Sequence, residues 1–157
     1  MDARRALAAA ALVTAAMAAP ALAQIPQIAP DVTNLKVTPK AFRALPSGGP
    51  VAAKGGALVT FKLDSGANVD FRVSALKPGR RGPTGCVKGT PKTTKQACTR
   101  RVPIPGGFTL IGIPGSNEIR FSGRIGDAAL GPDAYLLIAK ARGQAARSFS
   151  TTFKIVK

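Results

Sequence analysis

The chain has 157 residues and no His or Trp, and its 23 Lys and Arg outnumber its 7 Asp and Glu, which gives a formal net charge of +16 at pH 7. Without His, the chain lacks the most common general base and the most common metal ligand of proteins. The Ser residues have no neighbouring base to activate them, and the few carboxylates are scattered. The composition therefore argues against an enzyme, and we expect no cofactor and no metal site.

The first 23 residues predict an export signal. A basic start at Arg4 and Arg5 precedes an apolar run over residues 6–19, and Ala21-Leu22-Ala23 matches the small-x-small pattern that signal peptidase cuts. The run is shorter than the about 20 apolar residues that span a membrane. We therefore expect a cleaved signal peptide at 1–23, with an uncleaved anchor as the alternative. A cleaved signal implies a secreted or envelope-associated protein with no transmembrane span after cleavage.

Alternating apolar residues predict β-strands in the first half of the remaining chain. Residues 24–30 are rich in Pro and predict a flexible leader, and residues 31–157 have a length that suits a single domain. A first strand is expected over residues 31–39, because Leu35 and Val37 share one face. Residues 57–63 and 68–75 alternate in the same way. Their short link could form a hairpin, but we favour a crossing between two sheets.

Residues 77–101 form a basic segment that contains both cysteines. In an exported protein, Cys86 and Cys98 favour a disulfide, since a metal site would need more ligands than two thiols. The segment has eight bases and no acid, and its candidate anion-binding residues are Lys77, Arg80, Arg81, Lys88, Lys92, Lys95, Arg100 and Arg101. We interpret it as a cationic loop suited to anionic lipid, wall phosphate polymer or nucleic acid. The alternative is a loop whose charges only keep it soluble.

The positions of the aromatic residues indicate whether the chain could recognise nucleic acid. Proteins that bind single strands stack the bases on exposed aromatic side chains. All seven Phe lie in or beside predicted strands, and the basic segment contains none. We therefore expect no sequence-specific nucleic-acid recognition, although salt-sensitive adsorption is compatible with the charge.

The second half of the chain predicts further strands. Residues 101–104 and 108–111 are expected to be edge strands, because prolines and glycines interrupt them. Residues 117–125 alternate, which places Ile119, Phe121 and Ile125 on a buried face and Glu118, Arg120, Ser122 and Arg124 on a solvent face. Two more strands are expected, one beginning at Tyr135 and one over residues 149–155. Seven or eight short strands with no helix predict an all-β sandwich with antiparallel strands.

The turn before Tyr135 has a pattern of its own. The sequence Leu130-x-Pro132-x-x-Tyr135 is typical of a corner in which the Tyr ring is buried and its hydroxyl bonds to the upstream backbone. Asn117, Phe121, Pro132 and Tyr135 are the candidate fold-defining residues. With these residues the chain resembles the immunoglobulin-like, fibronectin-type-III-like modules of exported proteins from high-GC Gram-positive bacteria. The resemblance implies an immunoglobulin-like sandwich, but not a ligand. One departure is the basic segment 141–147, which replaces the acidic turn of such modules.

Together, these features predict an exported, non-enzymatic binding or structural module at the bacterial cell envelope. Its partner would be an unidentified envelope or surface component. The alternative is a polyanion-binding protein that acts through the basic loop 77–101.

Overall fold

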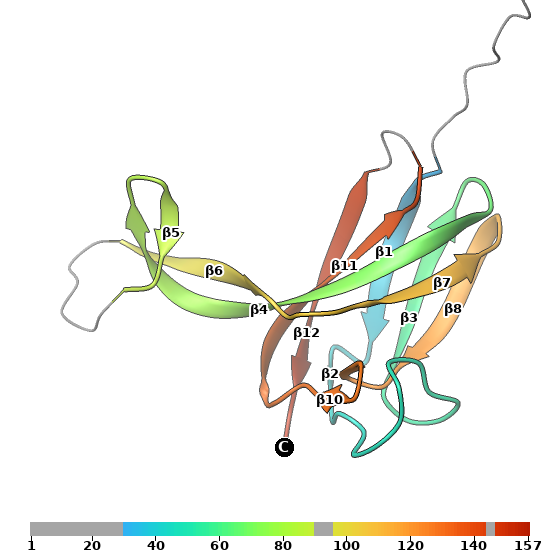
Figure 1. Ribbon diagram of the computed structural model, residues 1–157, viewed down its shortest axis with the longest axis horizontal. Helices are drawn as coiled ribbons and strands as arrows, with labels where there is room; N and C mark the ends of the chain where they lie inside the picture. The colour runs from blue at the N-terminus through green and yellow to red at the C-terminus, as the bar shows by residue number, and fades with distance from the viewer. Residues whose placement is uncertain (1–29, 90–95, 144–146) are drawn as a thin grey trace, which may run out of the picture.

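The computed structural model describes residues 30–89, 96–143 and 147–157 (Figure 1). The predicted signal peptide 1–23 and residues 24–29 of the predicted leader lie outside the described residues, as do Lys92 and Lys95. The described residues form strands and no helix, so the all-β prediction is confirmed. They accordingly contain no helix long and apolar enough to cross a membrane.

The smaller of the two main sheets, sheet A, has three strands. These are β1 (Val32–Thr38), β3 (Ala57–Leu63) and β8 (Gly115–Phe121). Their order is β1-β3-β8, and both pairs are antiparallel. The inward residues of β3 alternate along the strand as predicted, since Val59, Phe61 and Leu63 are all buried.

The larger sheet, sheet B, is built around the strand β4 (Ala67–Gly82), which has 16 residues. One side of β4 pairs with β11 (Asp133–Ala141), which in turn pairs with β12 (Ser148–Ile155) and through it with β2 (Ala41–Phe42). The start of β4 also pairs with β7 (Phe108–Gly112), and its end pairs with β5 (Gly85–Val87) and β6 (Ala97–Pro103). Because β3 and β4 belong to different sheets, the predicted crossing is confirmed.

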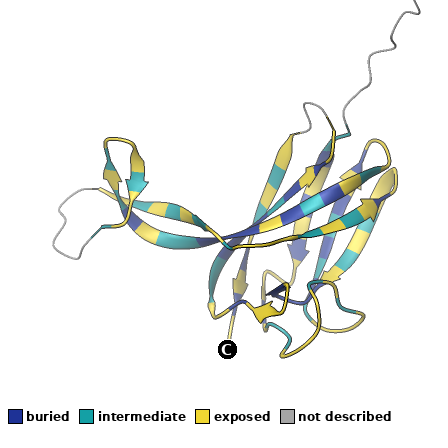
Figure 2. Cartoon of the chain, in the orientation of Figure 1, coloured by how far each residue is buried: buried dark blue, intermediate teal, exposed yellow. Residues whose placement is uncertain are grey.

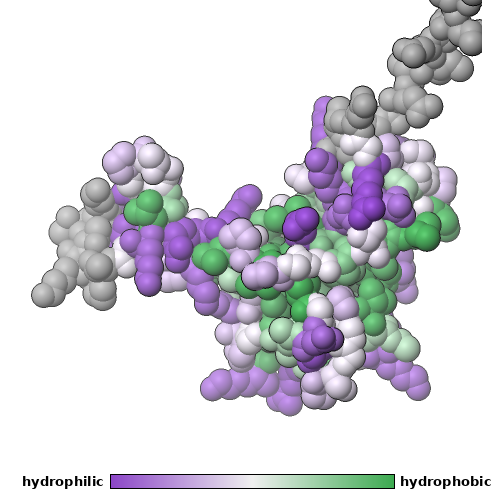
Figure 3. Space-filling view, in the orientation of Figure 1, coloured by the Kyte–Doolittle hydropathy of each residue, from purple (hydrophilic) through white to green (hydrophobic). Residues whose placement is uncertain are grey.

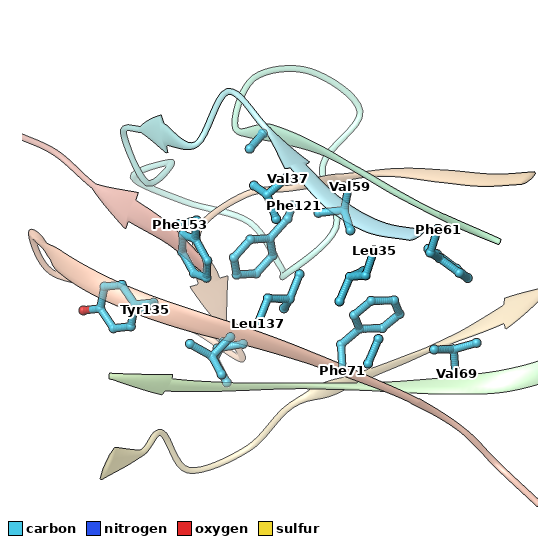
Figure 4. Close-up of a cluster of buried hydrophobic side chains, with 14 of the residues drawn as sticks. Leu35, Val37, Val59, Phe61, Val69, Phe71, Phe121, Tyr135, Leu137 and Phe153 are labelled. Atoms are coloured by element: carbon cyan, nitrogen blue, oxygen red, sulfur yellow. The ribbon is translucent and has the colours of Figure 1, made fainter. Parts of the chain in front are cut away.

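One hydrophobic core takes side chains from both sheets (Figure 4). Phe121 of β8 is fully buried, and its ring lies 5.6 Å from that of Phe153 and 5.7 Å from that of Phe108, centroid to centroid. The Phe71 and Phe108 rings stack at 4.9 Å. The phenylalanines of this core therefore pack against one another. Phe42, Phe61, Phe71, Phe121 and Phe153 are buried, whereas Phe108 and Phe149 are partly buried.

The strand predicted over residues 117–125 is shorter than expected. β8 ends at Phe121, and a small separate sheet pairs β9 (Arg124–Ile125) with β10 (Ala128–Ala129). The break falls at Gly123, which has a φ of 78°. The prediction that Ser122 and Arg124 face solvent is wrong, because both are buried. The described residues form twelve strands, more than the seven or eight predicted, because several of them are as short as these two.

The largest correction concerns the basic segment. Its described part is not a loop, because β4 continues through residue 82 and pairs there with β5 and β6. These strands leave the body of the molecule together as an extended projection (Figure 1). The segment lacks the alternation of a half-buried strand because neither of its faces covers the core.

Candidate functional site

We call residues 77–89 and 96–101 the arm. Its central strand is the end of β4, with β5 along one edge and β6 along the other. Most arm residues are partly or fully exposed (Figure 2). Figure 3 shows hydrophilic side chains gathered where the arm leaves the body. The structure therefore places the described candidate anion-binding residues on a projecting, solvated element.

A disulfide joins the two outer strands of the arm. Cys86 of β5 and Cys98 of β6 are bonded, as the sequence predicted, with a Cα–Cα distance of 5.9 Å. Between them lies Gly79 of β4, and a Cβ added there would lie 2.7 Å from Cys86 Sγ and 2.7 Å from the Val87 carbonyl oxygen. The disulfide thus crosses over the central strand, and the crossing requires a residue without a side chain. Nothing in the local sequence around Gly79 indicates this close contact.

The arm cations lie on both of its faces. Directly opposite residues of paired strands share a face, and successive residues of a strand alternate. Lys77 lies opposite Arg100, and Arg81 lies opposite Cys86, so these three bases share the face that carries the disulfide. Arg80 and Arg101 lie on the other face. The bases are therefore distributed around the arm and can be approached from several sides.

Lys77 is already engaged at the base of the arm. Its Nζ donates to Asp133 Oδ2, at the start of β11. This hydrogen bond lowers the pKa of Asp133, helped by a bond from the Ala134 backbone N–H, and it raises the pKa of Lys77. Asp133 thus accepts both from Lys77 and, at 2.8 Å, from the backbone N–H of the next residue. The ion pair makes Lys77 a weaker candidate for binding an external anion.

In contrast to Lys77, Arg100 has a side-chain nitrogen without a hydrogen-bond partner among the described residues. Its side chain lies beside Gly79 on the disulfide face, and this nitrogen, Nε, is buried. A buried donor without an acceptor costs free energy. Because this nitrogen is buried, an external anion reaches it only if the Arg100 side chain moves.

The predicted fold-defining residues belong to the body and not to the arm. Tyr135 is 5% exposed, and its hydroxyl donates to the Gly131 carbonyl at 2.9 Å, so the corner has the predicted geometry. Figure 4 shows this hydroxyl pointing away from the core. The Asn117 side chain bonds both backbone groups of Ile113, at 2.9 and 2.8 Å, and fixes the turn between β7 and β8. Pro132 is exposed.

Sequence reasoning missed a buried arginine. The Arg124 guanidinium is surrounded by backbone carbonyls, because its nitrogens donate to Leu45, Pro46 and Gly48 at 2.7–3.2 Å and also to Asp127. Only 8% of the residue is exposed. This arrangement ties the loop before β3 to the turn after β8, so the role of Arg124 is to hold the fold rather than to bind a ligand.

Comparisons with known proteins identify no family for the chain. No protein-family model matches the sequence. No curated protein matches it either. The functional argument therefore depends on the arm and the body themselves.

Proposed function

We propose that the protein is an exported, non-enzymatic binding module that holds an anionic polymer or surface at the cell envelope through its arm. The observation that carries this proposal is the projecting arm, which belongs to a segment with eight bases and no acid. An element of one charge sign that extends from the body can reach a phosphate-rich surface while the body stays clear of it. Each base that engages an anionic membrane contributes about 1 kcal/mol.

For the body we propose an immunoglobulin-like sandwich. Three features support this: two sheets that share one core, a crossing from β3 to β4, and the hydrogen bond from Tyr135 to Gly131. Such a body would act as a rigid base for the arm. Export is supported by the pattern of residues 1–23 and by the disulfide, because disulfides persist in oxidising compartments.

Adsorption to vesicles that contain phosphatidylglycerol, and to immobilised polyphosphate, tests the role of the arm. The arm variant combines Arg81→Gln with Lys88→Gln, two exposed positions. A control with the same charge combines Lys36→Gln with Lys62→Gln, on the outer face of sheet A. We expect the arm variant to adsorb up to about thirtyfold more weakly at low salt and the control to stay near the parent. The difference should disappear as salt screens the charges.

Equal losses in the two variants would show that the overall charge is responsible and would overturn the proposal for the arm. The export proposal is tested separately, by the intact mass of protein recovered outside the cells. We expect it to begin at Gln24, and recovery of a chain that retains residues 1–23 in the membrane fraction would contradict export as a free protein.

A further inference from the structure

A shallow apolar groove lies beside the base of the arm. It has a volume of about 400 Å³, within the range of small-molecule sites. Its walls come from Lys40 and from the strands β2, β4, β11 and β12, and the lining residues are Lys40, Ala41, Leu76, Ala134, Thr152, Phe153 and Lys154. The groove shares no residue with the arm as defined above.

Beside the groove, the outer face of sheet B, which points away from the core, carries a buried leucine. Tyr135 and Leu137 face the core, so Leu136 between them points outward. Leu136 is nevertheless only 5% exposed. It lies opposite Ser74 of β4, which is two residues before Leu76 and on the same face. An outer sheet face normally carries polar side chains, so a buried leucine near Leu76 is unusual there.

Cations surround the groove. Lys40 and Lys154 line it, and both are exposed. Arg101 lies opposite Leu76 in the register of β4 and β6, and therefore on the same face. No lining residue carries a carboxylate. Asp133 precedes the lining residue Ala134, but its side chain bonds Lys77. The groove thus combines an apolar floor with a rim of positive charge.

We infer that this groove binds an anionic lipid, with the acyl chain along Leu76 and Ala134 and the acidic headgroup at Lys40 and Lys154. Burial of methylene groups supplies affinity through the hydrophobic effect, and the lysines select a negative headgroup. The apolar side chains of the floor and the positive charge of the rim together favour a ligand that has both an apolar chain and an anionic group. This inference does not depend on binding by the arm.

Dodecyl phosphate, below its critical micelle concentration, is a suitable probe. We expect it to bind one per chain and to shift the NMR signals of the Ala41 and Ala134 amides and methyl groups. Glycerol phosphate has the headgroup without the chain, and dodecyl maltoside has the chain without the charge, so both should bind at least about tenfold more weakly. Affinity should rise with alkyl length, by at most about fourfold per methylene.

Three variants locate the site. Lys40→Gln with Lys154→Gln should weaken dodecyl phosphate about tenfold, whereas the sheet A control, Lys36→Gln with Lys62→Gln, removes the same charge and should have little effect. Ala41→Glu places a carboxylate at the groove from an exposed position and should also abolish most binding. Leu76→Asn should weaken the dependence on chain length. Melting curves check that each variant is folded.

Three results would overturn the inference: equal affinity for glycerol phosphate and dodecyl phosphate, equal losses in the two lysine variants, or unchanged binding in Ala41→Glu. Tighter binding of an acidic peptide than of dodecyl phosphate, with the same NMR shifts, would also overturn it in favour of a protein partner. The arm variant, Arg81→Gln with Lys88→Gln, should retain dodecyl phosphate binding, so failure of the arm proposal and failure of the groove inference are distinguishable.

Discussion

Arg124 donates a hydrogen bond from Nε to the backbone carbonyl of Gly48, 76 positions earlier in the chain, at 2.7 Å. The bond joins the loop that precedes β3 to the turn that follows β8. Bonds to the carbonyls of Leu45 and Pro46 make the same connection. Backbone hydrogen bonds, such as the one from the Leu45 N–H to the Ser122 carbonyl, hold the same loop, and Arg124 adds several side-chain bonds to them.

Replacing this side chain should destabilise the protein. Arg124→Ala removes a buried side chain together with its hydrogen bonds to carbonyls on partly or fully exposed residues, and we expect the free energy of unfolding to fall by about 1–3 kcal/mol. Arg120→Ala, at an exposed position of β8, is the matched control and should change it by less than about 0.5 kcal/mol. Urea denaturation followed by circular dichroism measures both. Similar values for the two variants would mean that the carbonyls are satisfied without Arg124.

The corner hydrogen bond can be measured apart from the packing of the ring. Tyr135→Phe removes the hydroxyl that donates to Gly131 and should cost about 1 kcal/mol. Tyr135→Ala also removes the ring, which stacks on Phe153 at 5.4 Å, and should cost about 3–5 kcal/mol. A loss below about 1 kcal/mol for Tyr135→Ala would show that the corner does not contribute to stability.

The crossing of the disulfide over β4 predicts an unusual sensitivity at Gly79. Gly79→Ala places a Cβ against Cys86 Sγ and the Val87 carbonyl, and overpacking of this kind costs about 1–3 kcal/mol. Gly131→Ala is the control, since a Cβ there meets no atom within 4 Å among the described residues. The expected readout is faster reduction of the disulfide by dithiothreitol in Gly79→Ala only. Unchanged reduction would mean that the arm relaxes around the added methyl group.

The ion pair at the base of the arm predicts a pH dependence. The hydrogen bond from Lys77 lowers the pKa of Asp133 in the folded state below its usual 3.8. A lowered carboxyl pKa stabilises the fold above the unfolded pKa, and this stabilisation is lost as the pH falls through the folded pKa. The melting temperature of Asp133→Asn should thus lie below that of the parent at neutral pH, and the two should converge in acid. A constant difference down to pH 2 would contradict this.

The sequence predicted the body of the protein better than the arm. Strands such as β3 have one buried and one solvated face. Val59 and Phe61 therefore alternate with polar residues, and this two-residue period can be read from the sequence. The arm has no such faces, and its Pro78-Gly79 pair has the local character of a turn. Its strand structure depends on pairing with residues about twenty positions away, which no local pattern shows.

Only part of the candidate site could be predicted, because local patterns do not show contacts between distant residues. Charge and cysteine content can be read directly from the sequence, so the disulfide and the cationic character of the arm were found. The ion pair of Lys77 with Asp133 joins residues 56 positions apart, and the burial of Arg124 depends on loops folding around it. Apolar positions of the groove, such as Ala41 and Ala134, become a surface only when β2 and β11 are brought together by β12.

The continuity of β4 has a mechanical consequence. The same strand that forms the middle of the arm pairs with β11 along seven successive positions, from Ala75 opposite Tyr135 to Val69 opposite Ala141. Tension applied along the arm would load these backbone hydrogen bonds in shear, so many of them must break together before the strand can slide. A pull at the end of the arm would thus act along the direction in which the paired strands resist separation most.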